Sequence, residues 1–280
     1  MGNVAEQPTT RTLLSTAITL GVDRLDAEAL LGALVRRSRA QLIAFDEAPV
    51  DDLTAAMFQA GLARRASGEP LAYITGIREF WSLPLVVSPA VLIPRPETEL
   101  LVELCLQRFG TEPRKVADLG TGSLAIAAAL ASERPAWHIV ATDHSREALA
   151  IAGINRQRLN LENIELREGN WCAALDESGA DLFDAILGNP PYVQAGDPAL
   201  AALAHEPRSA LVAADEGYAD LFALAAGARE HLRSGGILLL EHGSSQAARL
   251  GAELVALGYA RVVCHRDLAG HDRVTEAVWP

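Results

Sequence analysis

The chain has 280 residues, of which 50% are hydrophobic and 21% are charged, the balance of a folded globular protein rather than of a disordered one. No uninterrupted apolar run approaches the ~18 residues of a membrane-spanning helix, and the polar N-terminus lacks the pattern of a secretory signal. We therefore expect a soluble cytoplasmic protein with no membrane partner. The three scattered cysteines have no CxxC spacing, so neither a disulfide framework nor a metal site is expected.

The net charge of −12 is unevenly distributed along the chain. Residues 1–95 carry 9 basic and 10 acidic side chains, whereas residues 96–280 carry 15 basic and 26 acidic ones, a net charge of −11. An acidic surface repels the phosphate backbone of a nucleic acid. Nucleic acid is therefore disfavoured as a direct partner, and we expect a monomer.

Residues 10–67 have the pattern of three short helices. Apolar residues recur at helical spacing, the expected caps of the first two helices are Thr9-Thr10 and Asp26, and the third helix stops at Gly68-Glu69-Pro70. Short helices joined by short polar loops predict a small helical bundle. We place this domain at residues 1–72.

The pattern changes after the bundle. Residues 73–95 combine β-branched and aromatic positions with a glycine and several prolines, which predicts a β-hairpin linker. From residue 96 to 280 strands alternate with helices: the expected strands are 116–117, 138–142, 164–167, 184–187, 237–240, 260–264 and 274–278, and the expected helices are 125–132, 146–156, 219–232 and 245–257. This alternation predicts an α/β fold with a mostly parallel seven-stranded sheet and an antiparallel pair at one edge.

A glycine-containing turn, Gly120-Thr121-Gly122-Ser123, joins the first of these strands to a helix. Glycines let the backbone approach a ligand closely, and a helix N-terminus supplies unpaired N–H groups. Asp143 ends the next strand, where a carboxylate can accept hydrogen bonds from ribose hydroxyls. Together they predict an adenosine-containing cofactor, either a dinucleotide or S-adenosylmethionine. The turn lacks the GxGxxG spacing, which disfavours the dinucleotide.

A second motif, Asn189-Pro190-Pro191-Tyr192, follows the strand expected at 184–187, at the end of the sheet where α/β folds bind ligands. The prolines stiffen the backbone, so the Pro190 carbonyl can face a ligand, and Asn189 offers a side-chain carbonyl beside it. Two fixed acceptors suit an –NH2 group whose two hydrogens must both be bonded. Tyr192 adds a flat surface on which a planar amide or base can stack.

These features resemble the class I methyltransferases with an [N/D]PP[Y/F] motif, which transfer methyl from S-adenosylmethionine to a conjugated nitrogen. Over residues 65–280 the chain is also similar to one branch, the HemK-type release-factor glutamine methyltransferases. The similarity lies in GEPLAYITG (68–76), Phe80-Trp81, LIPRPETE (92–99), EPRSALVAAD (206–215) and LLEHG (239–243). The preceding bundle has the size of that family's N-terminal domain.

The resemblance implies a Rossmann-like fold and transfer of methyl to N5 of the glutamine in the Gly-Gly-Gln loop of class I peptide chain release factors, with S-adenosylhomocysteine as the second product. It implies that residues 1–72 dock the substrate. The implied substrate-binding residues are Asn189, Pro190, Pro191 and Tyr192, of which Asn189, Pro190 and Tyr192 are catalytic. The implied cofactor-binding residues are Gly120, Thr121, Gly122, Ser123, Leu124, Asp143, Asn170, Trp171 and Asn189.

Two positions depart from the family pattern. Leu124 stands where glycine is usual, so its side chain must point away from the cofactor, and Asn170 stands where an acidic or other polar residue is common. Two other functions stay open: a sister enzyme that modifies a ribosomal-protein glutamine, and an N6-adenine nucleic-acid methyltransferase, which would need a basic surface. His242 is expected to be satisfied locally rather than to act as a general base.

Overall fold

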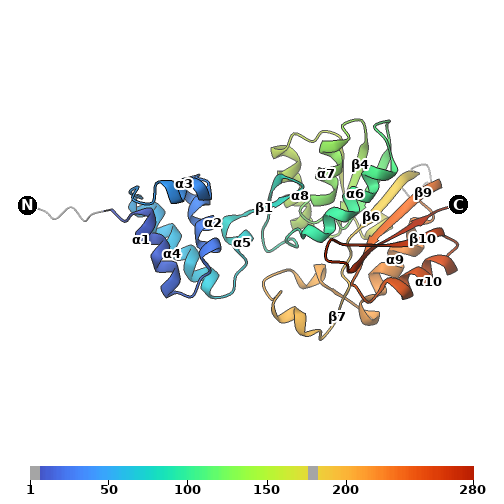
Figure 1. Cartoon of the computed structure of the whole chain (residues 1–280). Helices are drawn as coiled ribbons and strands as arrows, with labels where there is room; N and C mark the ends of the chain where they lie inside the picture. The colour runs from blue at the N-terminus through green and yellow to red at the C-terminus, as the bar shows by residue number, and fades with distance from the viewer. Residues whose placement is uncertain (1–6, 176–181) are drawn as a thin grey trace, which may run out of the picture. The chain divides into compact units, whose positions relative to one another are not determined.

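The computed structural model describes residues 7–175 and 182–280. The chain divides into two compact units, one ending at Gly76 and one beginning at Ile77. The first unit is helical, as the sequence predicts (Figure 1). Its helices are α1 (Thr10–Thr19), α2 (Arg24–Val35), α3 (Arg39–Ala44), α4 (Asp52–Ala66) and α5 (Leu71–Thr75). Leucine, alanine and phenylalanine side chains from the first four helices form one buried core, including Leu13, Leu31, Leu42, Phe58 and Leu62.

The helix caps of this unit agree with the sequence prediction at one of two positions. Thr9 caps α1 through a capping box with Thr12. Asp26 is not the cap of α2, because the helix begins three residues earlier than expected and Asp23 accepts a hydrogen bond from the Leu25 N–H at 2.7 Å. Asp26 lies in the first turn and instead accepts from Arg65 Nε at 2.6 Å, so its carboxylate joins α2 to α4.

The second unit opens with the expected β-hairpin, although residues 71–75 before it are helical rather than extended. Strands β1 (Ile77–Phe80) and β2 (Leu83–Val86) pair antiparallel, with Phe80 opposite Leu83. Trp81 and Ser82 form the two-residue turn, and both have positive φ angles, 52° and 59°. Positive φ at both central residues is the requirement of the turn type that matches strand twist.

The sheet has the predicted topology, with strand order β10-β11-β9-β6-β3-β4-β5. Five neighbouring strands, β9, β6, β3, β4 and β5, are parallel to one another. Strand β11 is antiparallel to both β9 and β10. The strands are β3 (Lys115–Leu119), β4 (His138–Asp143), β5 (Ile164–Glu168), β6 (Phe183–Gly188), β9 (Leu232–Glu241), β10 (Ala260–Arg266) and β11 (Asp272–Val278). The carboxyl ends of β3, β4 and β6 therefore meet at one edge, where a ligand site is expected.

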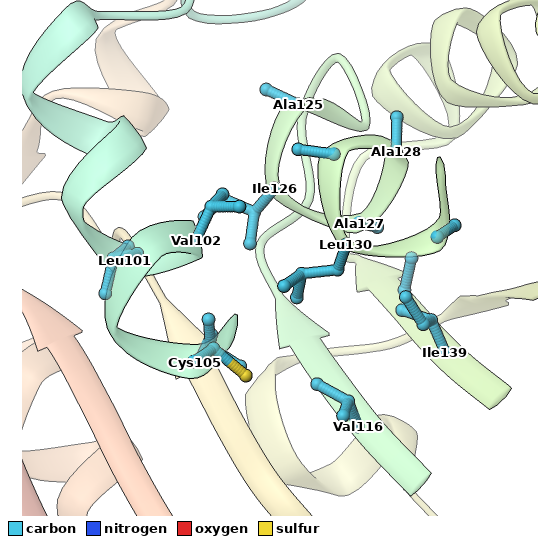
Figure 2. Close-up of a cluster of buried hydrophobic side chains, with 14 of the residues drawn as sticks. Leu101, Val102, Cys105, Val116, Ala125, Ile126, Ala127, Ala128, Leu130 and Ile139 are labelled. Atoms are coloured by element: carbon cyan, nitrogen blue, oxygen red, sulfur yellow. The ribbon is translucent and has the colours of Figure 1, made fainter. Parts of the chain in front are cut away.

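Helices cover both faces of this sheet (Figure 1). Helices α6 (Glu99–Arg108), α7 (Ala125–Glu133) and α8 (Arg146–Arg158) pack on one face, and α9 (Ala219–Ala228) and α10 (Ala247–Ala256) pack on the other. Neighbouring residues of one strand face opposite cores: Val116 belongs to the first and Ala117 to the second. Figure 2 shows part of the first core, where Val102 of α6 lies beside Ile126 of α7.

Several elements differ from the sequence expectation, which has three helices in residues 10–67 where the structure has α1, α2, α3 and α4. Helix α6 is missing from it, although the buried residues Leu101, Val102 and Cys105 have helical spacing. The helix expected at 219–232 ends at Ala228, and β9 begins at Leu232, because the strand extends back past Gly235, whose φ is 79°. Within the residues that the structure describes, no helix is both long enough and apolar enough to cross a membrane.

Candidate active site

A cavity of about 610 Å³ lies at the carboxyl ends of the parallel strands, within the size range of roughly 300–1,000 Å³ typical of ligand sites. One group of lining segments surrounds the predicted cofactor turn: residues 120–123, 143–145 and 170–171. A second group lies beside the Asn189 motif and comes from the segments 90–98 and 207–212. The cavity therefore brings both sequence motifs together in one site.

The cofactor turn is shaped by two glycines and a buried acid. Gly120 and Gly122 have φ angles of 77° and 54°, which glycine adopts without steric penalty. Asp118 Oδ2 accepts hydrogen bonds from the Thr121 hydroxyl at 2.6 Å and from the Ala127 N–H at 3.2 Å. Burial raises the pKa of Asp118 to about 6. The carboxylate therefore fixes the turn to the start of α7 from beneath, while the backbone of the turn faces the cavity.

Leu124, which the resemblance assigns to the cofactor site, follows this turn and is not among the residues that line the cavity. Its φ is 76°, the left-handed conformation usual for glycine, and it is the N-cap residue of α7. The left-handed backbone turns the side chain into the core on the α6 and α7 face of the sheet, where it is fully buried. The leucine therefore satisfies the requirement that its side chain point away from the ligand.

Asp143 lines the cavity at the end of β4, as predicted, and also braces the cofactor turn. Its Oδ2 accepts from the Gly122 N–H at 2.9 Å, and its Oδ1 accepts from the Ser145 N–H at 2.9 Å. A carboxylate oxygen can accept more than one hydrogen bond. Asp143 can therefore hold the turn and still accept from a ligand in the cavity.

Asn170 and Trp171 line the cavity next to the turn, as predicted. The Trp171 indole N–H donates to Asp220 Oδ1 at 3.0 Å, and Asp220 also lines the cavity. A Cβ added to Gly120 would lie 2.8 Å from Trp171 Cζ3, so the indole packs directly on the glycine backbone. The absence of a side chain at Gly120 is thus required by the position of Trp171.

The Asn189 motif divides between the cavity and the core. Asn189 and Pro191 line the cavity, whereas Pro190 and Tyr192 do not. The Tyr192 ring packs against the core beneath α9 and α10, and its hydroxyl donates to Glu241 Oε1 at 3.2 Å. The structure therefore does not bring the Tyr192 ring to the wall of the cavity, and its hydroxyl bonds to a buried acceptor.

Asn189 is oriented by a hydrogen bond from its amide nitrogen. Nδ2 donates to Thr98 Oγ1 at 3.2 Å. No donor among the described residues reaches Asn189 Oδ1 or the Pro190 carbonyl. The carbonyl end of the asparagine, which lines the cavity, is therefore available to a ligand.

A buried ion pair joins the two loops on the substrate side of the cavity. Glu206 accepts from the Ile93 N–H at 3.0 Å and pairs with the Arg95 guanidinium. The loops 90–98 and 207–212, which line the cavity beside Asn189, are thus tied to one carboxylate. Both loops lie in segments that carry the family resemblance, but composition and spacing alone do not reveal this pairing.

His242 is satisfied by its neighbours, as expected from the sequence. Its Nε2 lies 2.8 Å from Thr275 Oγ1, and its Nδ1 lies 2.9 Å from the Gly243 carbonyl. Burial lowers the pKa of His242. Both ring nitrogens are engaged, so His242 is not placed to take a proton from a ligand in the cavity.

Sequence comparison identifies the family. A model of the PrmC N-terminal domain matches residues 11–76, and a model of the methyltransferase small domain matches residues 95–213. The release factor glutamine methyltransferase of Pseudomonas aeruginosa is 48% identical over 258 residues, 91% of this chain and 92% of that protein. The protein of the same name from Escherichia coli is 45% identical over 254 residues, 90% of this chain and 91% of that protein. The chain belongs to the release factor glutamine methyltransferase family.

Solved structures with the same fold support the fold assignment of this methyltransferase. A methyltransferase from Pyrococcus furiosus superposes with a TM-score of 0.53, covering 77% of this chain and 96% of that chain at 18% identity. The METTL16 methyltransferase domain superposes with a TM-score of 0.55, covering 71% of this chain and 90% of that chain at 19% identity. The expected Rossmann-like methyltransferase fold and the expected family are therefore confirmed.

Sequence reasoning missed three side chains that shape the site of this methyltransferase. Thr98 and Asp220 line the cavity, and Glu241 is buried and accepts a hydrogen bond from the Tyr192 hydroxyl. Burial raises the pKa of Glu241 to about 7. Thr98 and Glu241 lie inside the motifs LIPRPETE and LLEHG, but the motifs alone do not place them beside the Asn189 motif. The hydrogen bonds from Asn189 to Thr98 and from Tyr192 to Glu241 do so in the folded chain.

Proposed function

We propose that this methyltransferase transfers a methyl group from S-adenosylmethionine to N5 of the glutamine in the Gly-Gly-Gln motif of class I peptide chain release factors. Relatives at 45–48% identity over nine-tenths of the chain carry the corresponding name. The observation that carries the proposal is the orientation of Asn189, whose amide nitrogen donates to Thr98 and whose carbonyl oxygen is left for a ligand.

The residues of the first lining group fit an S-adenosyl cofactor. A Cβ added to Gly122 would meet no atom within 4 Å, so the backbone here borders open space that a ligand can fill. Asp143 offers carboxylate acceptors suited to ribose hydroxyls, while Asn170 and Trp171 offer an amide and an aromatic edge beside Gly120. When bound, the cofactor supplies an electrophilic methyl group on a positively charged sulfur.

The substrate side holds the glutamine amide. An amide nitrogen is a poor nucleophile because its lone pair is delocalised into the carbonyl, the conjugation that also underlies the ~18–20 kcal/mol rotation barrier of peptide bonds. Asn189 Oδ1 and the Pro190 carbonyl accept the two N–H groups and hold the nitrogen in line with the methyl group. Much of the acceleration then comes from positioning. The two carbonyl dipoles also stabilise the positive charge that develops on nitrogen.

The reaction requires no side chain of this protein as a general base. The methylated nitrogen becomes strongly acidic and loses its proton readily. His242, the histidine that the sequence analysis considered as a base, has both ring nitrogens engaged. The proposal therefore needs only two fixed acceptors and a well-oriented donor of the methyl group.

We further propose that residues 1–72 dock the release factor, that residues 73–95 link the domains and that the enzyme works in the cytoplasm, where release factors meet ribosomes. The helical unit has its own buried core. Deletion of this unit should leave cofactor binding intact and reduce methylation of the intact factor more than methylation of a short Gly-Gly-Gln peptide. Equal losses on both substrates, measured by initial rates, would show that the unit only stabilises the catalytic domain.

The principal experiment compares substrates with labelled S-adenosylmethionine. We expect label in a purified class I release factor and none in the same factor with its Gly-Gly-Gln glutamine replaced by alanine. A ribosomal protein and duplex DNA serve as competing substrates for the two alternative functions. Preferential labelling of either one would overturn the proposal.

A further inference from the structure

Asn155 of helix α8 is a polar side chain in the interior, with 0% of its surface exposed. Its Oδ1 accepts from the Val86 N–H at 2.7 Å, and its Nδ2 donates to the Val86 and Ser123 carbonyls, both at 2.9 Å. Burial of a carboxamide costs free energy unless its donors and its acceptor are bonded, and here all of them are. Three segments that lie far apart in the chain therefore meet at this one side chain.

At the hairpin, Asn155 takes the place of a neighbouring strand. Phe80 faces Leu83 across the two-residue turn, and in the same register Val86 faces Ile77. Hydrogen-bonded pairs flank such a turn and then alternate with pairs of the other kind along the strands. Val86 therefore stands in a pair of the other kind, and its N–H and carbonyl point away from β1. The carboxamide supplies the acceptor and the donor that this edge of the hairpin needs.

The same side chain holds the end of the cofactor turn. Asp118, Thr142 and Asp143, which lie on β3 and β4, accept hydrogen bonds from the first three residues of the turn. Ser123 is the fourth residue of the turn and lines the cavity. Its carbonyl accepts from Asn155. The two parallel strands thus hold one end of the turn, and α8 holds the other.

The hairpin leads into the substrate side of the cavity. Val86 ends β2, and the segment 90–98, which lines the cavity beside Asn189, begins four residues later. The last residue of that segment, Thr98, accepts the hydrogen bond from Asn189. Neither Val86 nor Asn155 is among the residues that line the cavity. Asn155 therefore reaches both sides of the site through the backbone behind its walls.

We propose that Asn155 is a positioning residue that sets the spacing between the cofactor turn and the substrate-side segment 90–98. Its carboxamide joins the backbone at Ser123 to the backbone at Val86. Methyl transfer needs its two reacting atoms in line and close together, and a misplacement of about 1 Å can cost about 10²-fold in rate. The effect on transfer rests on the proposed function, whereas the effect on cofactor binding does not.

The chain offers a matched control in Asn163. Its Nδ2 donates to the Ala131 and Arg134 carbonyls at 3.3 Å and to the Trp137 carbonyl at 3.1 Å. These bonds join the end of α7 to the start of β4, at the opposite end of the sheet from the cavity. Loss of this carboxamide should therefore lower stability and leave the site in place.

The first test combines calorimetric titration with S-adenosylhomocysteine and single-turnover methylation of a Gly-Gly-Gln peptide, well below the melting transition of each variant. Asn155→Ala should weaken binding about threefold to tenfold, on the scale of one lost hydrogen bond. At saturating cofactor and peptide its transfer rate should fall about tenfold or more. Asn155→Asp keeps the shape and the acceptor for Val86 but cannot donate to Ser123, so it should weaken binding similarly. Asn163→Ala should keep affinity and rate within about twofold of the parent.

The second test follows amide hydrogen exchange at Val86. This N–H lies outside the cavity, but its acceptor is the side chain that also holds the cofactor turn. A ligand that orders the turn should also make opening at Val86 rarer. S-adenosylhomocysteine should therefore slow exchange at Val86 in the parent and in Asn163→Ala, and should leave it unchanged in Asn155→Ala.

Parent-like affinity and rate in Asn155→Ala would overturn the inference, as would equal losses in Asn155→Ala and Asn163→Ala. If Asn155→Ala and Asn155→Asp fail to fold, exchange at Val86 that S-adenosylhomocysteine does not slow in the parent still overturns it. Failure of the parent to methylate the release factor or the peptide would instead contradict the proposed function, because the titration and the exchange measurement use no methyl acceptor.

Discussion

The two corners of the active site are held in place in different ways. The turn of the cofactor corner is fixed by its own strand and the next strand along the chain: the Gly120 and Thr121 N–H groups donate to the Thr142 carbonyl, and the Thr121 hydroxyl donates to Asp118. The substrate corner is fixed by groups far apart in sequence, since Asn189 depends on Thr98, 91 residues away. The cofactor turn is thus held by the adjacent strand β4 and by its own strand β3, whereas the substrate corner depends on a contact between segments 91 residues apart.

The largest effect is expected at the substrate corner. Asn189→Ala removes one of the two acceptors that hold the amide, and the Pro190 carbonyl alone cannot direct both hydrogens. Loss of one preorganised group of this kind lowers turnover by about 10²–10³. Single-turnover methylation of the release factor at saturating cofactor measures it, and a cofactor titration should change only modestly.

A matched variant sharpens this result. Asn189→Asp keeps an acceptor oxygen but loses the N–H that donates to Thr98, so we expect activity between those of the parent and the alanine variant. Turnover of Asn189→Ala equal to that of the parent would make Asn189 a structural turn residue and the mechanism wrong.

A smaller effect is expected at the cofactor corner. Asp143→Ala removes the acceptor assigned to the ribose and two braces of the turn, the bonds from Gly122 and Ser145. Loss of hydrogen bonds to a charged group is worth roughly 1.5–3 kcal/mol, about tenfold to a hundredfold in affinity. Calorimetric titration with S-adenosylmethionine tests this, with Asn189→Ala as the control. Unchanged affinity in Asp143→Ala would contradict the ribose assignment.

Variants of Leu124 test whether the cofactor corner depends on the left-handed backbone conformation at this position rather than on a side chain in the cavity. Leu124→Gly loses core packing but relieves the left-handed strain, so it should lower the free energy of unfolding by about 1–3 kcal/mol. Leu124→Ala keeps that strain and should be the less stable of the two, despite its larger side chain. Urea denaturation measures both, and cofactor affinity should stay within about twofold. The reverse order of stability would refute the argument.

The smallest expected effect is the dependence of stability on pH. Because burial raises the pKa of Glu241 to about 7, above the ~4.3 of an exposed glutamate, the folded state binds this proton more tightly than the unfolded state. Its contribution is complete below about pH 4 and is lost as the pH rises through about 7. Glu241→Gln has no proton to lose, so its stability relative to the parent should increase from about pH 5 to pH 8. Parallel stability curves would contradict this.

The comparison of the two corners also explains what the sequence could predict. Alternating strand and helix patterns are local, and they predict the sheet, its antiparallel edge and the positions of Gly120 and Asn189. The inward turn of Tyr192 depends on Glu241, which reaches it only through strand pairing. Helix α2 begins three residues before the expected position, so Asp23 is its cap, and Asp26 in the first turn pairs with Arg65, 39 residues away. What the sequence does not reveal is set by such distant partners.

Leucine at position 124 has a consequence for the unfolded chain as well. A glycine there samples many backbone conformations before folding, and each must be given up when the turn forms. A leucine samples fewer, and burial of its side chain in the core of α6 and α7 contributes free energy that a glycine lacks. The turn is therefore ordered by the packing of the protein itself, and the cofactor meets a backbone whose shape does not have to be selected at the moment of binding.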